Sequence, residues 1–188
     1  EFYPLSTLGG ISSKGITLKE RLGNPPPRIA EAPGCMLNAI GLQNPGVDYF
    51  IEHDLPWLKE QGTVVIANIA GNTPEEYCAM AEKLSDTNVD MLEMNISCPN
   101  VKEGGVQFGT SCIGVEQITA AVRKHCTKPL MVKLSPNVTD IGDIAASAEA
   151  GGADAISMIN TLTGMKIDIQ TRRPIIRNNT GGVSGPAL

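Results

Sequence analysis

Residues 64–96, VVIANIAGNTPEEYCAMAEKLSDTNVDMLEMNI, carry the pattern that decides the fold. Two short apolar runs, at 64–69 and 91–96, enclose a stretch at 73–86 whose apolar residues recur with helical spacing. Thr73 followed by Pro74 is typical of a helix start, because a threonine side chain caps free N–H groups and proline is tolerated in the first turn. A strand, a helix and a second strand in this order predict two parallel strands joined by a crossover helix.

The same alternation continues on both sides of this unit. We expect further strands at 8–13 (LGGISS), 130–135 (LMVKLS) and 155–160 (AISMIN), and further helices at 47–61, 115–126 and 140–152, the last capped by Asp140. The strands are continuous apolar runs, as expected where both faces of a sheet are covered. The sequence therefore predicts an α/β fold whose five parallel strands are neighbours in chain order.

The long connections follow strands, which indicates an active face at the carboxyl ends of the strands, as in a (β/α)8 TIM barrel. A closed barrel of this kind needs about 250 residues, whereas the chain has 188. No low-complexity linker divides it, so we expect a single domain over 1–188 that forms an incomplete (β/α)8 barrel. Residues 166–176 (KIDIQTRRPII) alternate in polarity and predict a hairpin of two short strands outside the barrel wall.

Composition excludes several functions. A formal net charge of -5 provides no basic stripe for nucleic acid, and no apolar run approaches a membrane span. Five scattered cysteines without a C-x-x-C pair favour a reducing compartment. This cysteine usage leads us to expect a cytoplasmic protein. The chain begins at Glu1 rather than Met and shows no signal-peptide pattern, and we expect its true start to be missing. With only two histidines and no metal-ligand spacing, we expect no metal site.

Polar residues mark the ends of the predicted strands. They are Lys14, Asn68, Asn95, Cys98, Lys133 and Asn160, and Asn38 joins them from a loop. If the strands are parallel neighbours, these side chains converge on one pocket. Carboxamides match a ring that carries both N–H and C=O, such as a pyrimidine or a flavin, and a lysine can stabilise the negative charge of a flavin that accepts a hydride. A thiolate near cations could accept a proton.

Each of these residues also has a structural interpretation. Cys98 could be a small core residue, Lys133 could extend its ammonium group to the surface, and Asn95, Asn100 and Asn137 could be turn formers. The glycine-rich segment 178–188 (NNTGGVSGPAL) predicts either an ordinary turn between a strand and a helix or a backbone that approaches a cofactor closely. The combination of these residues, rather than any one of them, favours the pocket.

Six motifs resemble the catalytic subunit of class 1B dihydroorotate dehydrogenase. They are RLGNPPPR (21–28), MLNAIGLQNPG (36–46), NISCPN (95–100), VKLSPNVTDI (132–141), INTLTGMKIDIQTRRPI (159–175) and TGGVSGPA (180–187). The resemblance implies an FMN-containing (β/α)8 barrel of pyrimidine biosynthesis that oxidises dihydroorotate to orotate. It also implies that Cys98 removes the C5 proton while the C6 hydride passes to flavin N5. Compared with that family, we expect this chain to lack the first βα unit and the last strands.

The resemblance further assigns binding residues. It implies substrate contacts at Lys14, Asn38, Ala39, Ile40, Gly41, Leu42, Asn95, Asn100, Asn160 and Thr161. It implies FMN contacts at Lys14, Gly15, Asn68, Asn95, Lys133, Ile159 and Gly185.

For partners, the resemblance implies an electron-transfer subunit with FAD and a [2Fe-2S] cluster that passes electrons to NAD, around a homodimeric core of a heterotetramer. Three alternatives stay open. One is the FMN domain of dihydropyrimidine dehydrogenase, which shares a similar Cys-Pro strand end, and another is a class 1A enzyme that uses fumarate. The third is an inactive or non-enzymatic barrel piece.

Overall fold

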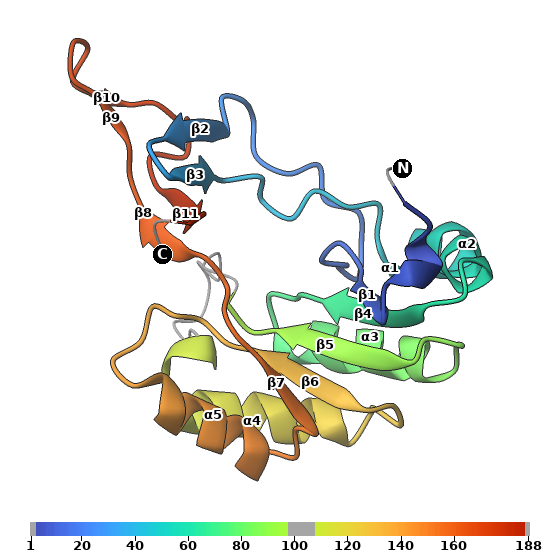
Figure 1. Cartoon of the computed structure of the whole chain (residues 1–188). Coiled ribbons are helices and arrows are strands. Elements are labelled where there is room, and N and C mark those ends of the chain that lie inside the picture. The colour runs from blue at the N-terminus through green and yellow to red at the C-terminus, as the bar shows by residue number, and fades with distance from the viewer. Residues whose placement is uncertain (1–2, 98–107, 187–188) are drawn as a thin grey trace.

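The computed structural model describes residues 3–97 and 108–186 and shows a mixed α/β fold with two main sheets (Figure 1). The larger sheet is a curled half-barrel of five parallel strands in the order β1-β4-β5-β6-β7. The strands are β1 (Gly10–Ser12), β4 (Val64–Ile69), β5 (Met91–Asn95), β6 (Leu130–Lys133) and β7 (Ala155–Ser157). The predicted strands, their direction and their order in the sheet are confirmed.

Three helices cover one face of this sheet (Figure 1): α3 (Pro74–Ser85), α4 (Cys112–Arg123) and α5 (Ile141–Ala150). The two predicted caps are confirmed, since Thr73 Oγ1 accepts from the backbone N–H of Glu76 at 3.3 Å and Asp140 Oδ1 accepts from that of Gly142 at 2.7 Å. Helix α4 begins earlier than predicted because Ser111 caps it, accepting from the N–H of Gly114 at 3.2 Å. Side-chain capping therefore sets where all three helices begin.

The predicted helix at 47–61 forms in three parts. These are α1 (Val47–Tyr49), the π-helical turn η2 (Phe50–Asp54) and α2 (Leu55–Glu60). Pro56 lies in the first turn of α2 and has no N–H to bond to the preceding turn, which accounts for the irregular hydrogen bonding there. Two short 3-10 turns, η1 (Leu5–Thr7) and η3 (Phe108–Thr110), complete the helical elements of the described residues.

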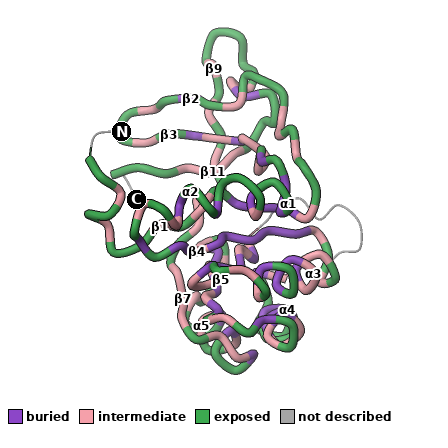
Figure 2. The backbone as a smooth tube through the Cα atoms, turned by 90° about the vertical axis from the view of Figure 1, so that its right-hand side faces the viewer, coloured by how far each residue is buried: buried purple, intermediate pink, exposed green. Residues whose placement is uncertain are grey.

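The main core lies between the sheet and its helices. Alternate residues of the strands, such as Val65 in β4 and Leu92 in β5, are fully buried together with Tyr77 and Met80 of α3 (Figure 2). The residues between them lie on the other face, which is more polar and more exposed. The expectation that both faces of the strands are covered holds fully for the face that packs against the helices, whereas the second face is only partly covered and carries the side chains of the candidate site.

A second, four-stranded antiparallel sheet lies across from the half-barrel (Figure 1). Its strands are β2 (Ile29–Ala32), β3 (Cys35–Asn38), β8 (Leu162–Gly164) and β11 (Gly181–Ser184), in the order β2-β3-β11-β8. The expectation that Asn38 lies in a loop is wrong, because it is the last residue of β3. Of the two interpretations of residues 178–188, the turn between a strand and a helix is wrong, because β11 lies within this segment. The hairpin predicted within 166–176 is confirmed as β9 (Ile167–Asp168) and β10 (Arg173–Pro174), which pair antiparallel.

Two findings limit the kinds of function. Within residues 3–97 and 108–186, no helix combines the length and the apolar character needed to cross a bilayer. In the same residues, no group of three or more His, Cys, Asp or Glu side chains is arranged to hold a metal ion.

Candidate functional site

Strand register brings polar side chains together at the carboxyl edge of the half-barrel. In the β5–β6 pair Asn95 lies opposite Lys133, and in the β6–β7 pair Lys133 lies opposite Ser157. The chain after β7 stays at this edge, where the backbone N–H of Asn160 donates to Leu134 O at 3.0 Å. The Asn160 side chain then donates from Nδ2 to Asn95 Oδ1 at 3.0 Å. Three of the predicted site residues therefore lie side by side.

Asn95 is fixed from two directions. Its backbone carbonyl accepts a 2.7 Å hydrogen bond from the hydroxyl of Tyr77 in α3, a residue that is only 2% exposed. Its Oδ1 accepts from the Ser97 N–H at 3.2 Å as well as from Asn160. Because both donors approach the oxygen, the NH2 group of Asn95 points away from them and remains the donor that can be offered to a ligand.

The segment after β1 runs along the end of β4. Asn68 N–H donates to Ser13 Oγ at 3.0 Å, and Ile16 N–H donates to Asn68 O at 2.7 Å. Lys14 and Gly15 lie between these two contacts. A Cβ placed on Gly15 would lie 3.2 Å from Asn68 Oδ1 and 3.1 Å from Leu42 Cδ2, so glycine permits the close approach of the backbone. The close approach of Gly15 to Asn68 and Leu42 brings the ends of β1 and β4 next to the predicted substrate loop.

The loop Asn38 to Leu42 leaves the second sheet and reaches the same spot. Asn24 supports it by donating from Nδ2 to Ala39 O and from its backbone N to Ile40 O, both at 2.9 Å. Leu42 has a positive φ of 55°, and its carbonyl accepts a 2.7 Å bond from Asn44 Nδ2. These hydrogen bonds support the conformation of the loop from within the protein.

Glu93 is the residue of this edge that the sequence prediction missed. It lies on β5 two residues before Asn95, is 4% exposed and accepts hydrogen bonds from Ser12 Oγ at 2.6 Å and Asn68 Nδ2 at 2.5 Å. The available signal was a carboxylate inside an apolar strand, two positions from Asn95 and therefore on the same face.

The electrostatics of Glu93 follow from these contacts. Burial by itself raises the pKa of the Glu93 carboxyl. Hydrogen bonds from Ser12, Asn68 and Ser157, together with the charge of Lys133, outweigh burial and hold the pKa below its usual value. The edge therefore contains a buried, ionised carboxylate at neutral pH.

The other predicted site residues are less closely joined to this edge. Thr161 follows Asn160, donates its N–H to Asn160 Oδ1 at 2.8 Å and packs against Gly182 of β11. Gly185 lies instead beside the β2–β3 turn, where an added Cβ would meet Gly34 O at 2.8 Å. Ile159 is half exposed. Cys98 and Asn100 lie outside the described residues, and the binding and catalytic roles of all these residues stay predictions.

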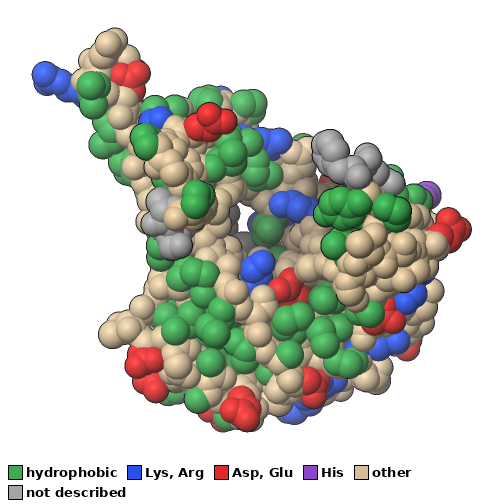
Figure 3. Space-filling model, in the orientation of Figure 1, with side chains coloured by type: hydrophobic (Ala, Val, Ile, Leu, Met, Phe, Trp, Pro, Cys, Tyr) green, Lys and Arg blue, Asp and Glu red, His purple; other side chains and the backbone are tan. Residues whose placement is uncertain are grey.

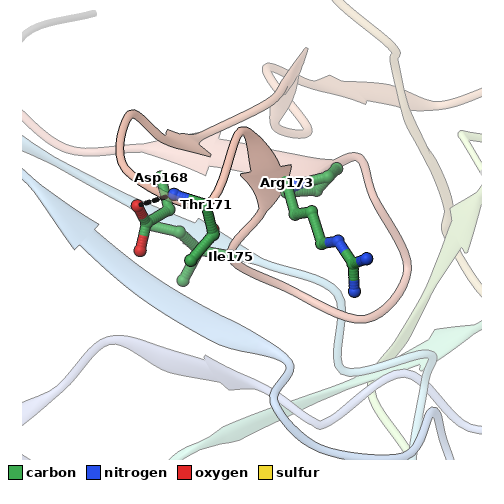
Figure 4. A pocket seen from close by; sticks show the side chains of 5 residues that line it. Asp168, Thr171, Arg173 and Ile175 are labelled. Atoms are coloured by element: carbon green, nitrogen blue, oxygen red, sulfur yellow. Dashed lines mark hydrogen bonds between the residues drawn. The ribbon is translucent and has the colours of Figure 1, made fainter.

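Figure 3 shows a hollow between the two sheets, with Lys or Arg side chains at its rim. A separate pocket lies at the β9–β10 hairpin and is lined by Asp168, Thr171, Arg173, Pro174 and Ile175 (Figure 4). The N–H groups of Thr171 and Gln170 hold the pKa of Asp168 below its usual value by bonding its carboxylate, as in an ordinary turn. Within residues 3–97 and 108–186, none of the strand-end residues lines the pocket at the hairpin.

A curled parallel sheet with amides, a lysine and a buried carboxylate at the carboxyl ends of its strands is typical of α/β-barrel enzymes, whose ligand sites lie at that edge. The sequence profile of dihydroorotate dehydrogenase matches residues 1–188, and the chain belongs to this family. The family resemblance stated from the motifs is thereby confirmed.

Curated relatives support the same family assignment. The chain is 58% identical over 188 residues to the protein named dihydroorotate dehydrogenase B (NAD(+)), catalytic subunit, of Alkaliphilus metalliredigens. It is 56% identical to proteins of the same name from Alkaliphilus oremlandii and Geobacillus kaustophilus. The matches cover 100% of this chain and 62%, 62% and 60% of these relatives, so the chain spans about three fifths of their length.

Among solved structures, the carboxyl transferase domain of Rhizobium etli pyruvate carboxylase aligns with a TM-score of 0.45 at 13% identity, over 56% of this chain and 18% of that one. This likeness is too low to support an inference.

Proposed function

We propose that the complete protein carrying this sequence uses FMN to oxidise dihydroorotate to orotate in pyrimidine biosynthesis. The observation that carries the proposal is the joining of Asn95, Asn160 and Lys133 at the carboxyl edge of the half-barrel, in a chain that belongs to the dihydroorotate dehydrogenase family. We further propose that residues 1–188 form one domain and that the half-barrel is part of an eight-stranded barrel.

The residues at the edge fit a flavin. Gly15 gives access to the backbone beside Asn68, whose carboxamide oxygen lies next to that glycine. Carboxamides can pair with the alternating N–H and C=O groups of an isoalloxazine ring, and the ammonium group of Lys133 can balance negative charge on it. We propose that Lys14, Gly15, Asn68, Asn95, Lys133, Ile159 and Gly185 hold FMN. When bound, FMN accepts the hydride that leaves the substrate.

The chain's own residues bind and orient the substrate. Asn95 offers its NH2 group, and Asn160, fixed by its bond to Asn95, sets the neighbouring amide. The loop Asn38 to Leu42, Lys14, Asn100 and Thr161 complete the proposed substrate site. We propose Cys98 as the base that removes the C5 proton, because a thiolate forms more readily near cationic groups and can then accept a proton.

For partners, the relatives are named as catalytic subunits of NAD(+)-linked enzymes. We propose the corresponding arrangement here, with an electron-transfer subunit that carries FAD and a [2Fe-2S] cluster and a homodimeric catalytic core, in the cytoplasm.

A visible spectrum and an activity assay of the purified complete protein test this proposal. We expect a bound flavin that absorbs near 450 nm, as a rough guide from flavin chemistry, and that is bleached by dihydroorotate under anaerobic conditions. Dihydrouracil lacks the carboxylate, so bleaching by dihydrouracil and not by dihydroorotate would support the dihydropyrimidine dehydrogenase alternative. Rapid reoxidation of the reduced flavin by fumarate would instead indicate a class 1A enzyme. A protein that binds no flavin contradicts the proposal.

A further inference from the structure

Glu93 has no part in the reaction proposed above, yet its position is unusual. Among the described residues it is the one Asp or Glu that is buried, at 4% exposure. Its donors come from three other strands: Ser12 of β1, Asn68 of β4 and Ser157 of β7. A buried carboxylate is costly unless it is well bonded, so a residue that serves packing alone would more simply be apolar.

The contact with Asn68 fixes the orientation of a carboxamide. An ionised carboxylate can only accept hydrogen bonds, so Asn68 must turn its NH2 group toward Glu93. The carboxamide oxygen of Asn68 then faces the other way, toward the backbone of Gly15, where an added Cβ would lie 3.2 Å from it. Glu93 therefore determines that the edge presents an acceptor, and not a donor, beside Gly15.

The charge of Glu93 also acts on its neighbours. Lys133, on the adjacent strand β6, is close enough to influence the carboxylate electrostatically. The pair places one positive and one negative charge on the inner face of the sheet. Removing the negative member would leave the lysine uncompensated beside any bound ring.

From these contacts we propose that Glu93 is a positioning residue for the flavin: it holds the Asn68 oxygen toward the cofactor as an acceptor for a ring N–H, and it moderates the charge of Lys133. This assignment rests on the FMN-dependent function proposed above. It concerns a residue that acts through Asn68 and Lys133 and does not itself take part in the chemistry.

The first test is Glu93→Gln in the complete protein. Glutamine has nearly the same shape, but its own NH2 group allows the Asn68 amide to turn over. We expect the affinity for FMN, measured by fluorescence titration of the flavin-free protein, to fall by about 5- to 150-fold, the range for a mispaired buried polar group. Glu116→Gln on the exposed surface of α4 makes the same charge change and should alter affinity by no more than about twofold.

The midpoint potential of bound FMN provides a readout that a packing role would not move. Loss of a negative charge favours the electron-rich reduced flavin, so the potential of Glu93→Gln should rise. If oxidised FMN loses about tenfold more affinity than reduced FMN, the two-electron potential rises by about 30 mV. Equilibration with redox dyes measures this shift, and the Glu116→Gln control should keep the wild-type potential.

An exchange variant tests the link to Asn68 directly. Asn68→Asp alone places two carboxylates against each other and should weaken FMN binding strongly. In the double variant Asn68→Asp with Glu93→Gln, the glutamine NH2 can donate to the new carboxylate, whose second oxygen still faces Gly15. We expect the double variant to bind FMN more tightly than either single variant. If the two residues acted independently, the losses of binding free energy in the single variants would add in the double variant.

The outcomes separate this proposal from the function on which it rests. A wild type without flavin overturns both. A wild type that binds FMN, with Glu93→Gln unchanged in affinity and potential, overturns the role of Glu93 alone. If Glu93→Gln does not fold, as judged by circular dichroism, the exchange variant decides: recovery of folding and FMN binding supports the proposal, and no recovery overturns it.

Discussion

The hydroxyl of Tyr77 joins helix α3 to the end of β5, and its removal tests whether the helix layer positions the site. Tyr77 is 2% exposed and donates to the carbonyl of Asn95 at 2.7 Å. Tyr77→Phe keeps the ring in the core but leaves a partly buried carbonyl without this donor. An unsatisfied buried polar group costs about 1 to 3 kcal/mol, so we expect the free energy of unfolding to fall by that amount.

Urea unfolding followed by circular dichroism measures this loss. With a slope of about 2 kcal/mol per molar urea, the midpoint should fall by about 0.5 to 1.5 M while the slope stays constant. Tyr49→Phe is the matched control, because Tyr49 is 47% exposed and contacts the ring of His53 at 4.4 Å between centroids. We expect this surface change to cost less than about 0.5 kcal/mol. Equal midpoint shifts in the two variants would refute the argument that the Tyr77 hydroxyl anchors β5.

Three further predictions concern the proposed site. The variant Asn160→Asp cannot donate a hydrogen bond to Asn95, and it adds a negative charge near the proposed substrate carboxylate. Its affinity for orotate, measured by titration, should therefore fall about tenfold or more. An affinity within a factor of two of the wild-type value would argue against this contact. The pKa of Glu93 is lower in the folded protein than the usual 4.5, so the stability that Glu93 contributes is present above pH 4.5 and is lost as the pH falls through the folded pKa. The free energy of unfolding of the wild type, measured at a series of acidic pH values, should show this loss. The same pH dependence in Glu93→Gln would contradict a contribution from Glu93. If Cys98 is the base, Cys98→Ser should slow single-turnover flavin reduction by about 10²- to 10⁴-fold at equal FMN content, and a change below about threefold would assign it a structural role.

The sequence by itself determined the half-barrel. Each strand is a local apolar run, two crossover helices begin at caps that the sequence predicts, Thr73 and Asp140, and parallel neighbours joined by helices leave few possible orders. The convergence of Asn95, Lys133 and Asn160 follows from the same local information, because parallel strands end at one edge.

Only the tertiary structure decided the second sheet. The glycine-rich segment Gly181–Ser184 has weak strand propensity, yet it pairs with β3, more than a hundred residues earlier in the chain, and with β8. Its glycines suit the crowding there, since a Cβ on Gly182 would clash with Thr161. Propensity within a short window cannot report such a pairing.

The role of Glu93 also belongs to the tertiary structure. The sequence places a carboxylate two residues before Asn95 and so on the same face of β5, but its donors come from β1, β4 and β7. These groups meet only when the sheet is assembled, and Ser12 and Glu93 are 81 positions apart. Local pattern therefore fixes which face a side chain occupies, whereas the charge state and the hydrogen-bond direction at that face depend on contacts between strands that are distant in the sequence.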